Sequence, residues 1–130
     1  MSGLSYLDAS ALVKLVIDEP ESPMLNRWYV EADRLVTSRL GVIETIRAAA
    51  RIAFDPAHRD LVIADLEIVE LSEAIARVAA SVGPPALRSL DAIHLATALA
   101  LAPDLDAFVT YDDRLADAAR MLGLPVVRPA

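Results

Sequence analysis

Short apolar runs alternate with helical patterns along the chain. The runs at residues 4–7, 35–37, 67–71, 107–110 and 125–127 have the length of strands and predict five of them. Between them, apolar residues recur at helical spacing in segments 11–17, 23–32, 40–54, 61–66, 73–82, 90–101 and 114–122. In segment 40–54, a stripe of Leu40, Ile43, Ile46 and Ala50 is predicted to face the core.

The alternation of strands and helices predicts an α/β fold. Strands joined through helices run parallel, so we expect a three-layer sandwich with a central parallel sheet of four to five short strands flanked by helices. At 130 residues the chain is expected to form a single domain, 1–130. Open sheets of this kind bind ligands outside the carboxyl ends of their strands. The residues that follow each strand are therefore the first candidates for a site.

Composition narrows the setting of the protein. Apolar residues make up 55% of the chain, which excludes a disordered protein. The absence of cysteine excludes disulfides, zinc–thiolate sites and thiol nucleophiles. No apolar run approaches the roughly 20 residues of a membrane span, and the first residues lack the pattern of a secretory signal. We therefore expect a cytoplasmic protein without membrane contact.

The charge balance bears on possible partners. The net charge is −7, which argues against a general attraction to nucleic acid. The cationic residues are Lys14 and eleven arginines, and arginine can form paired hydrogen bonds with a phosphate. A polyanion would therefore have to be held locally, by a few arginines or by a metal ion.

Two aspartates follow predicted strand ends. Asp8 comes directly after residues 4–7, where an aspartate also serves well as a helix N-cap, so both a structural and a functional role are open. After residues 107–110, Thr110 and Asp113 fit a capping box with Thr110 as the N-cap. That box leaves Asp112 without a structural role, so Asp112 is the candidate site residue.

A third acid, Asp91, lies near the start of the predicted helix 90–101. At 100° per residue it shares a helix face with Leu95 and Ala98. A carboxylate on an apolar face is costly unless it is paired or bound to a metal ion. The structural alternative is a favourable interaction with the helix N-terminus, with Ser89 as the cap.

A fourth acid, Glu44, has the weakest local signal. Its helix face also carries Arg47 and Arg51, so an ordinary ion pair on a solvated surface would explain it. Its position near the start of a helix that follows a strand is what places it with the other three acids.

The four acids together point to a metal ion. If they converge with a mean spacing of about 6 Å at an effective dielectric of about 20, each pair repels by about 3 kcal/mol. The total would equal a whole domain's stability, so such a cluster must protonate, spread or hold a cation. Oxygen ligands select a hard ion, Mg²⁺ or Mn²⁺. A hard ion in an open carboxylate site can activate water for phosphodiester hydrolysis.

Segments 7–14, 43–44, 90–98 and 110–115 resemble the corresponding segments of PIN domains. The most similar group is the VapC-like toxins of type II toxin–antitoxin systems. The resemblance covers nearly the whole chain in order and spacing. It depends on the ordered set of four acids, because no single motif is specific.

The resemblance implies a PIN-like fold and a Mg²⁺-dependent endoribonuclease that uses one or two Mg²⁺ or Mn²⁺ ions. RNA would be hydrolysed by in-line attack of metal-activated water. The implied catalytic acids are Asp8, Glu44, Asp91 and Asp112. Asp8 and Asp91 would be the main metal ligands, Asp112 a ligand directly or through water, and Glu44 a ligand or a water-orienting group. The implied supporting hydroxyls are those of Ser10 and Thr110.

Partners are also implied by the resemblance. They are an RNA substrate, a cognate VapB-like antitoxin whose tail occupies the groove and inserts a basic side chain among the acids, and a second copy of the chain in a homodimer. Four cations lie beside the acids in sequence and are predicted phosphate contacts, with ordinary surface charge as the alternative. They are Lys14, Arg39, Arg88 and Arg114.

Several other residues invite a functional interpretation that we do not favour. His94 is predicted to be a packed residue with a backbone partner, because a hard ion prefers oxygen ligands. His58, beside Pro56, is predicted to be solvated in a polar turn. Trp28 and Tyr29 are expected to make packing or oligomer contacts, since Leu25 shares their helical spacing.

Two families of phosphoryl-transfer domains fit the sequence less well than the endoribonuclease. Phosphoryl-transfer domains of the haloacid dehalogenase type have a second acid where this chain has Ser10. Receiver domains need a lysine after a late strand, and the only lysine here is Lys14. A catalytically silent PIN-like protein-binding module and a DNA-directed metal-dependent nuclease remain alternatives.

Overall fold

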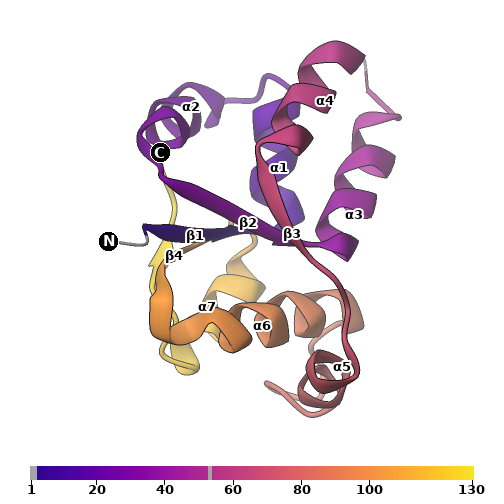
Figure 1. The fold of residues 1–130 in the computed structure, drawn as a ribbon, viewed down its shortest axis with the longest axis vertical. Coiled ribbons are helices and arrows are strands. Elements are labelled where there is room, and N and C mark those ends of the chain that lie inside the picture. The colour runs from indigo at the N-terminus through magenta and orange to yellow at the C-terminus, as the bar shows by residue number, and fades with distance from the viewer. Residues whose placement is uncertain (1–2, 53) are drawn as a thin grey trace.

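The computed structural model describes residues 3–52 and 54–130, which form a central sheet with helices on both faces (Figure 1). The strands are β1 (Leu4–Leu7), β2 (Arg34–Ser38), β3 (Leu66–Val69), β4 (Leu105–Val109) and β5 (Val126–Val127). The α-helices are α1 (Ala9–Val16), α2 (Ser22–Glu31), α3 (Arg39–Ala49), α4 (Pro56–Ala64), α5 (Glu73–Ala79), α6 (Ser89–Leu101) and α7 (Asp113–Met121), and a short 3₁₀ helix η1 (Ala102–Asp104) precedes β4. The predicted three-layer α/β sandwich is confirmed. Among the described residues, no helix is long and apolar enough to cross a membrane.

The sheet is apolar on both faces. Helices α1 to α4 lie on one side of it and α5 to α7 on the other (Figure 1). Leu7 packs with Leu12 and Leu25 in one core, and its neighbour Tyr6 packs with Phe108 in the other. Successive side chains of a strand point to opposite faces, so a strand buried on both sides has a continuous apolar run.

The order of the strands creates a crevice at one place in the sheet. All four neighbouring pairs are parallel, and the strands lie in the order β3-β2-β1-β4-β5. The chain moves outward from β1 through β2 to β3, then returns to the other side of β1 as β4. The N–H of Asp8 donates to the carbonyl of Val109 at 3.2 Å, directly where β1 and β4 end. Ligands bind at such a reversal in open α/β sheets.

Helix α3 faces the core with a different stripe from the predicted one. The buried residues are Gly41, Val42, Thr45 and Ala49. Ile43 and Ile46 instead have exposed fractions of 49% and 37%, so the predicted stripe is wrong. The smaller side chains let α3 pack closely, and the Thr45 hydroxyl is satisfied inside the helix by the Gly41 carbonyl at 2.7 Å.

Two helix boundaries also differ from the prediction. Helix α4 begins at Pro56 rather than at residue 61, because Asp55 caps it and proline is favoured in the first turn. His58 is therefore on a helix and not in a turn, and its Nε2 bonds to the Leu15 carbonyl at 2.7 Å. Helix α3 ends at Ala49, before the predicted end; Ala53 of the predicted segment lies outside the described residues.

Candidate active site

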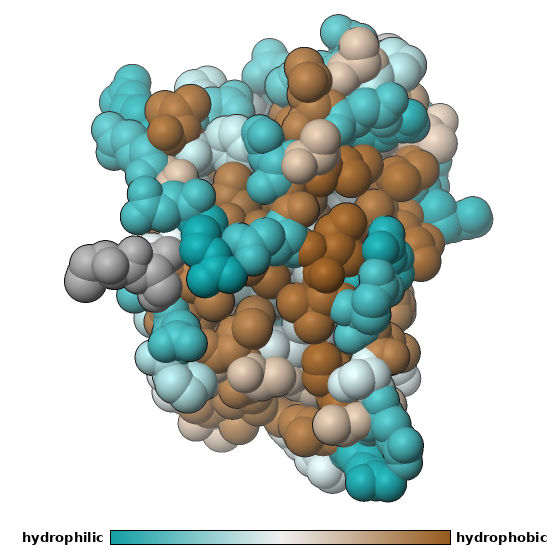
Figure 2. Space-filling model, in the orientation of Figure 1, coloured by the Kyte–Doolittle hydropathy of each residue, from teal (hydrophilic) through white to brown (hydrophobic). Residues whose placement is uncertain are grey.

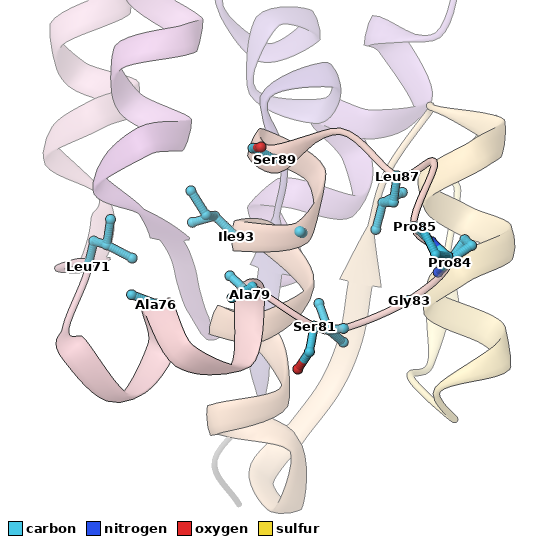
Figure 3. Close-up of a pocket in the computed structure, with 13 residues that line it drawn as sticks. Leu71, Ala76, Ala79, Ser81, Gly83, Pro84, Pro85, Leu87, Ser89 and Ile93 are labelled. Atoms are coloured by element: carbon cyan, nitrogen blue, oxygen red, sulfur yellow. The ribbon is translucent and has the colours of Figure 1, made fainter.

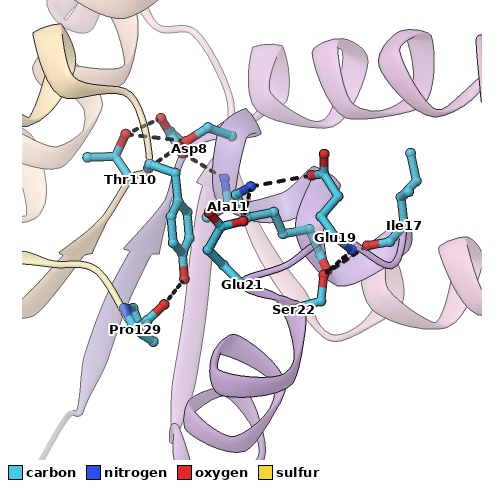
Figure 4. Close-up of polar contacts among 11 residues, drawn as sticks. Asp8, Ala11, Ile17, Glu19, Glu21, Ser22, Thr110 and Pro129 are labelled. Atoms are coloured by element: carbon cyan, nitrogen blue, oxygen red, sulfur yellow. Dashed lines mark hydrogen bonds and ion pairs between the residues drawn. The ribbon is translucent and has the colours of Figure 1, made fainter.

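Asp8 is the most deeply buried of the four acids, with 3% of its surface exposed. It caps α1, and its Oδ1 accepts the N–H of Ala11 at 3.0 Å. The same oxygen accepts from Ser10 Oγ at 2.6 Å, while Oδ2 accepts from Thr110 Oγ1 at 2.6 Å (Figure 4). A carboxylate offers about four lone-pair positions. These three bonds leave room on Oδ2 for one further ligand, so capping and a site role are compatible.

The surroundings of Asp8 do not fully compensate its charge. Burial raises the pKa of Asp8, although the electrostatic effect of nearby His94 and the hydrogen bonds from Ser10, Thr110 and Ala11 act to lower it. Burial opposes ionisation because the charged form loses its hydration. A cation beside Oδ2 would supply the missing compensation.

The loop between β4 and α7 connects Asp112 to Asp8. The N-cap of α7 is Asp112, whose Oδ1 accepts the N–H of Leu115 at 3.0 Å. The prediction of Thr110 as N-cap is therefore wrong. The Thr110 hydroxyl instead donates to Asp8 and accepts the N–H of Asp112 at 3.1 Å, because a buried carboxylate is the stronger acceptor. Asp113 lies in the first turn of α7 and forms an ion pair with Arg128 at 2.6 Å.

Asp91 lies in the first turn of α6, which begins at Ser89 with Arg88 as the N-cap residue; Ser89 is not the cap. Leu95 and Ala98, which share its face, are buried as predicted. Among residues 3–52 and 54–130, no hydrogen bond or ion pair to the Asp91 side chain is present. Burial and, next, the negative charge of Asp112 raise the pKa of Asp91, and Glu44 adds to the effect.

Glu44 is paired with a histidine and not with Arg47 or Arg51. Its Oε1 lies 2.7 Å from Nε2 of His94. His94 is packed as predicted, with 1% of its surface exposed, but its partners are side chains rather than backbone. Nδ1 of the same ring lies 2.6 Å from the Tyr6 hydroxyl.

The four acids therefore gather at the carboxyl edge of the sheet. The mutual effects on the pKa values link Asp91 with Asp112 and with Glu44, and His94 acts on both Asp8 and Asp91. In the described part of the chain, no arginine or lysine forms an ion pair with any of the four. The same residues contain no group of three or more acidic or histidine side chains already arranged to hold a metal ion. The donor atoms of the four acids are all carboxylate oxygens, which is the ligand type that a hard cation prefers.

The predicted phosphate contacts fall into two groups. Lys14 pairs with Glu21 at 2.8 Å and with Glu19 at 3.5 Å (Figure 4), and Arg39 pairs with Glu70. Arg88 and Arg114 are exposed. Neither has an ion pair with another described residue, and the charge of Arg88 acts on Asp91. Of these four cations, only Arg88 and Arg114 could bind a phosphate without first breaking an ion pair with a described residue.

Two hollows lie near these elements. One, of about 390 Å³, is lined by Ser10, Lys14, Glu44 and Tyr111 among others, and so borders one of the four acids. A larger one, of about 470 Å³, lies between α5, α6 and the 80–88 loop (Figure 3). Its lining residues are uncharged and mostly apolar, including Leu71, Val82 and Ile93. The first hollow is the one that belongs to the candidate site.

Sequence reasoning missed three residues that support the site. His94 bonds to Glu44 and Tyr6 bonds to His94. Arg128, in the C-terminal segment, donates to the Thr110 carbonyl at 3.1 Å. The signal for Tyr6 and His94 was a pair of polar groups on otherwise apolar faces, which must find partners when buried. Nothing in the local sequence around Arg128 indicates its contact.

Comparisons with known proteins identify the family of the chain. The family model of the PIN domain matches residues 5–121. The chain is 40% identical to Ribonuclease VapC47 of Mycobacterium tuberculosis, over 95% of this chain and 96% of that protein. Its fold is similar to the crystal structure of VapC20 of Mycobacterium tuberculosis, a sarcin–ricin loop cleaving toxin, with a TM-score of 0.75, 14% identity and coverage of 96% and 99%. It is also similar to a chain of a toxin–antitoxin complex from Klebsiella pneumoniae, with a TM-score of 0.68, 21% identity and coverage of 97% and 98%.

The family model matches most of the chain, and the identity to a VapC protein extends along nearly its full length. The chain belongs to the PIN-domain family and, within it, to the VapC-like group.

Proposed function

We propose that the protein is a Mg²⁺-dependent endoribonuclease toxin that hydrolyses RNA phosphodiester bonds with an activated water molecule. The observation that carries the proposal is the gathering of Asp8, Glu44, Asp91 and Asp112 at one edge, with no arginine or lysine of the described residues paired to them. The similarity to curated ribonucleases of the VapC group supports RNA as the substrate class.

Each acid has a proposed role. Asp8, Asp91 and Asp112 hold the Mg²⁺ ion, and Mn²⁺ is able to replace it, because all three offer carboxylate oxygen free of cationic partners. Bound there, the ion lowers the pKa of water and neutralises charge on the phosphate. Glu44, on the wall of the 390 Å³ hollow, serves as a further ligand or orients the attacking water. Ser10 and Thr110 keep the Asp8 carboxylate in place.

Phosphate contacts are proposed for the exposed cations at the edge of the site. Arg88 and Arg114 flank Asp91 and Asp112 in sequence and are not neutralised by described acids. Lys14 and Arg39 would first have to leave Glu21 and Glu70. A local pair of arginines is consistent with RNA binding by a chain whose net charge is −7.

Two protein partners are proposed. The similarity to a chain of a toxin–antitoxin complex supports a VapB-like antitoxin, which should copurify with this chain when the neighbouring gene is expressed with it. Exposed Ile43, Ile46 and Leu71 support a homodimer, and one face of the molecule shows a broad apolar area (Figure 2). A monomeric mass in solution would contradict the dimer. The setting proposed for all of these partners is the cytoplasm.

The test is cleavage of structured RNA with Mg²⁺, against EDTA and against the Asp91→Asn variant. The Asp91 side chain has no hydrogen bond to lose among the described residues, so the variant should fold. Its turnover should fall by about 10²-fold or more, as for loss of a group that stabilises the transition state. Arg120→Gln, on the exposed side of α7, is the control and should cut as the wild type does. Cleavage in EDTA, or an active Asp91→Asn variant, would contradict the proposal.

The same assay separates the two alternatives. A single-stranded and a duplex DNA of the same sequence are included beside the RNA, and preference for DNA would support the DNA-directed nuclease. Tight binding of the antitoxin by a chain that cuts neither polymer would support the protein-binding module.

A further inference from the structure

Three side chains from three different elements form a chain of hydrogen bonds that leads from the core to the candidate site. Tyr6 of β1 lies 2.6 Å from Nδ1 of His94 on α6, and Nε2 of the same ring lies 2.7 Å from Oε1 of Glu44 on α3. Tyr6 is fully buried and His94 is 1% exposed, whereas the Glu44 side chain is 26% exposed. The chain therefore runs from the core to Glu44, the one of the four candidate acids that lines the 390 Å³ hollow.

The chemistry of the three groups sets the direction of the bonds. An ionised carboxylate can only accept hydrogen bonds, so Nε2 of His94 must carry a hydrogen and donate it to Oε1 of Glu44. Burial raises the pKa of Tyr6, which keeps it a phenol whose hydroxyl is able to pair with Nδ1. The partner on one ring nitrogen decides which hydrogen the other nitrogen carries.

Packing leaves the imidazole little freedom. Its ring meets the Tyr6 ring edge-on with centroids 5.7 Å apart, and Tyr6 in turn stacks on Phe108 at 5.4 Å. On the α3 side, a Cβ at Gly41 would lie 3.2 Å from Cε1 of His94, so the helix backbone approaches the ring closely. Only one oxygen of Glu44 is held in this way. Its Oε2 accepts no hydrogen bond from the described residues.

We propose that His94, oriented by Tyr6, is a positioning residue that fixes the Glu44 carboxylate through Oε1 and leaves Oε2 directed to the reaction. This inference rests on the proposed function, in which Glu44 acts on the attacking water or its ion. His94 touches neither substrate nor ion. Its effect is on turnover and not on RNA binding, because it sets the geometry of an acid that the ground-state complex does not need.

The kinetic test compares His94→Leu, which removes the donor, with His94→Gln, whose amide can still donate to Glu44. We expect His94→Leu to lower kcat by about 10–100-fold, as for other residues that orient a site ligand. KM should stay within about twofold of the wild-type value. His94→Gln should recover part of the lost kcat. Thr97→Val is the matched control, since Thr97 is equally buried on α6 and donates only to the Ile93 carbonyl. It should lose stability but keep kcat.

Two further measurements keep the test decisive if His94→Leu folds poorly. Tyr6→Phe retains the ring that stacks on Phe108, and it should lower kcat several-fold without unfolding the chain. A long-range ¹H–¹⁵N spectrum of histidine-labelled protein, free of RNA and metal, should show a hydrogen on Nε2 of His94; His58, the other of the two histidines, is assigned with a His58→Gln variant. In a Glu44→Gln background, the His94→Leu change should have almost no further effect on kcat.

The outcomes separate this inference from the proposed function. A wild type that cuts RNA, combined with His94→Leu kinetics equal to those of Thr97→Val, would overturn the positioning role alone. A hydrogen found only on Nδ1 of His94 would overturn it as well, whatever the activity. A wild type that cuts no RNA with any divalent ion would instead sink the proposed function.

Discussion

Asp8 and Asp91 are carboxylates in surroundings that favour their neutral form. Burial raises the pKa of both, and Asp112 raises that of Asp91 further. At neutral pH the metal-free fold therefore carries an unfavourable charge at its own site. Under the proposed function, a bound divalent ion would remove that cost, and the site would favour ion binding at the expense of the stability of the metal-free fold.

The pH dependence of unfolding tests this cost in the Asp91→Asn variant without metal. The folded state binds the Asp91 proton more tightly than the unfolded chain, because its pKa is raised from the ordinary 3.8. The protonated Asp91 therefore stabilises the folded state fully below pH 3.8, the pKa in the unfolded chain. This stabilisation is lost as pH rises through the pKa in the folded state. In EDTA, the urea-derived free energy of unfolding of the wild type should therefore fall relative to that of Asp91→Asn as pH rises through this window. If the difference in free energy of unfolding between the two proteins stays constant with pH, or changes in favour of the wild type, the placement of Asp91 is contradicted.

Sequence reasoning identified the acids but not their partners, and the reason is physical. Asp8 and Asp112 follow strands and Asp91 interrupts an apolar face, which are local signals. The bond between Tyr6 and His94 joins residues 88 positions apart, and the bond between Thr110 and Asp8 joins residues 102 apart. Such contacts are decided by packing, whereas the local capping pattern alone predicts Thr110 as a helix cap.

At the scale of the elements, the rotation of α3 determines what Glu44 can reach. The apolar period in 40–54 favoured Ile43 and Ile46 as the inner face, but the helix turns Gly41 and Thr45 inward instead. Only a residue without a side chain allows the first turn of α3 to approach Thr37 and His94. Close approach outweighed the burial of two isoleucines here, and hydrophobic periodicity alone does not contain that information.

The close approach predicts a specific effect of Gly41→Ala. Its methyl group would overlap Thr37 Oγ1 and lie 3.2 Å from His94 Cε1, which displaces α3 and with it Glu44. We expect a loss of about 1–3 kcal/mol in urea unfolding, typical of overpacking, together with a fall in RNA cleavage rate of about tenfold or more for a displaced site acid. Gly123→Ala is the control. Its backbone has φ of +79°, and nothing lies within 4 Å of the added methyl group.

The control variant should lose about 1 kcal/mol from the left-handed backbone conformation and should keep the cleavage rate. A Gly41→Ala protein that is destabilised yet cuts RNA at the wild-type rate would show that the position of α3 does not matter to the site.

At the scale of the whole molecule, the sheet topology brings together residues that are far apart in the sequence. The order β3-β2-β1-β4-β5 brings the ends of β1 and β4 together, so acids from positions 8 and 112 become neighbours while α6 supplies Asp91. Alternating strands and helices predicted this edge as the place for a site, and the fold confirms the parallel sandwich. Among the described residues, no group of three or more acidic or histidine side chains is arranged to hold a metal ion.

Whether these carboxylates share one cation is most directly measured by diffraction from crystals of the protein soaked in MnCl₂, with an anomalous map calculated at the manganese edge. We predict a single strong peak bounded by Asp8, Asp91 and Asp112 in the wild type, and its loss in Asp91→Asn crystals soaked in the same way. A map without a peak among these three acids, or a peak that persists unchanged in Asp91→Asn, would contradict the proposed metal-dependent chemistry.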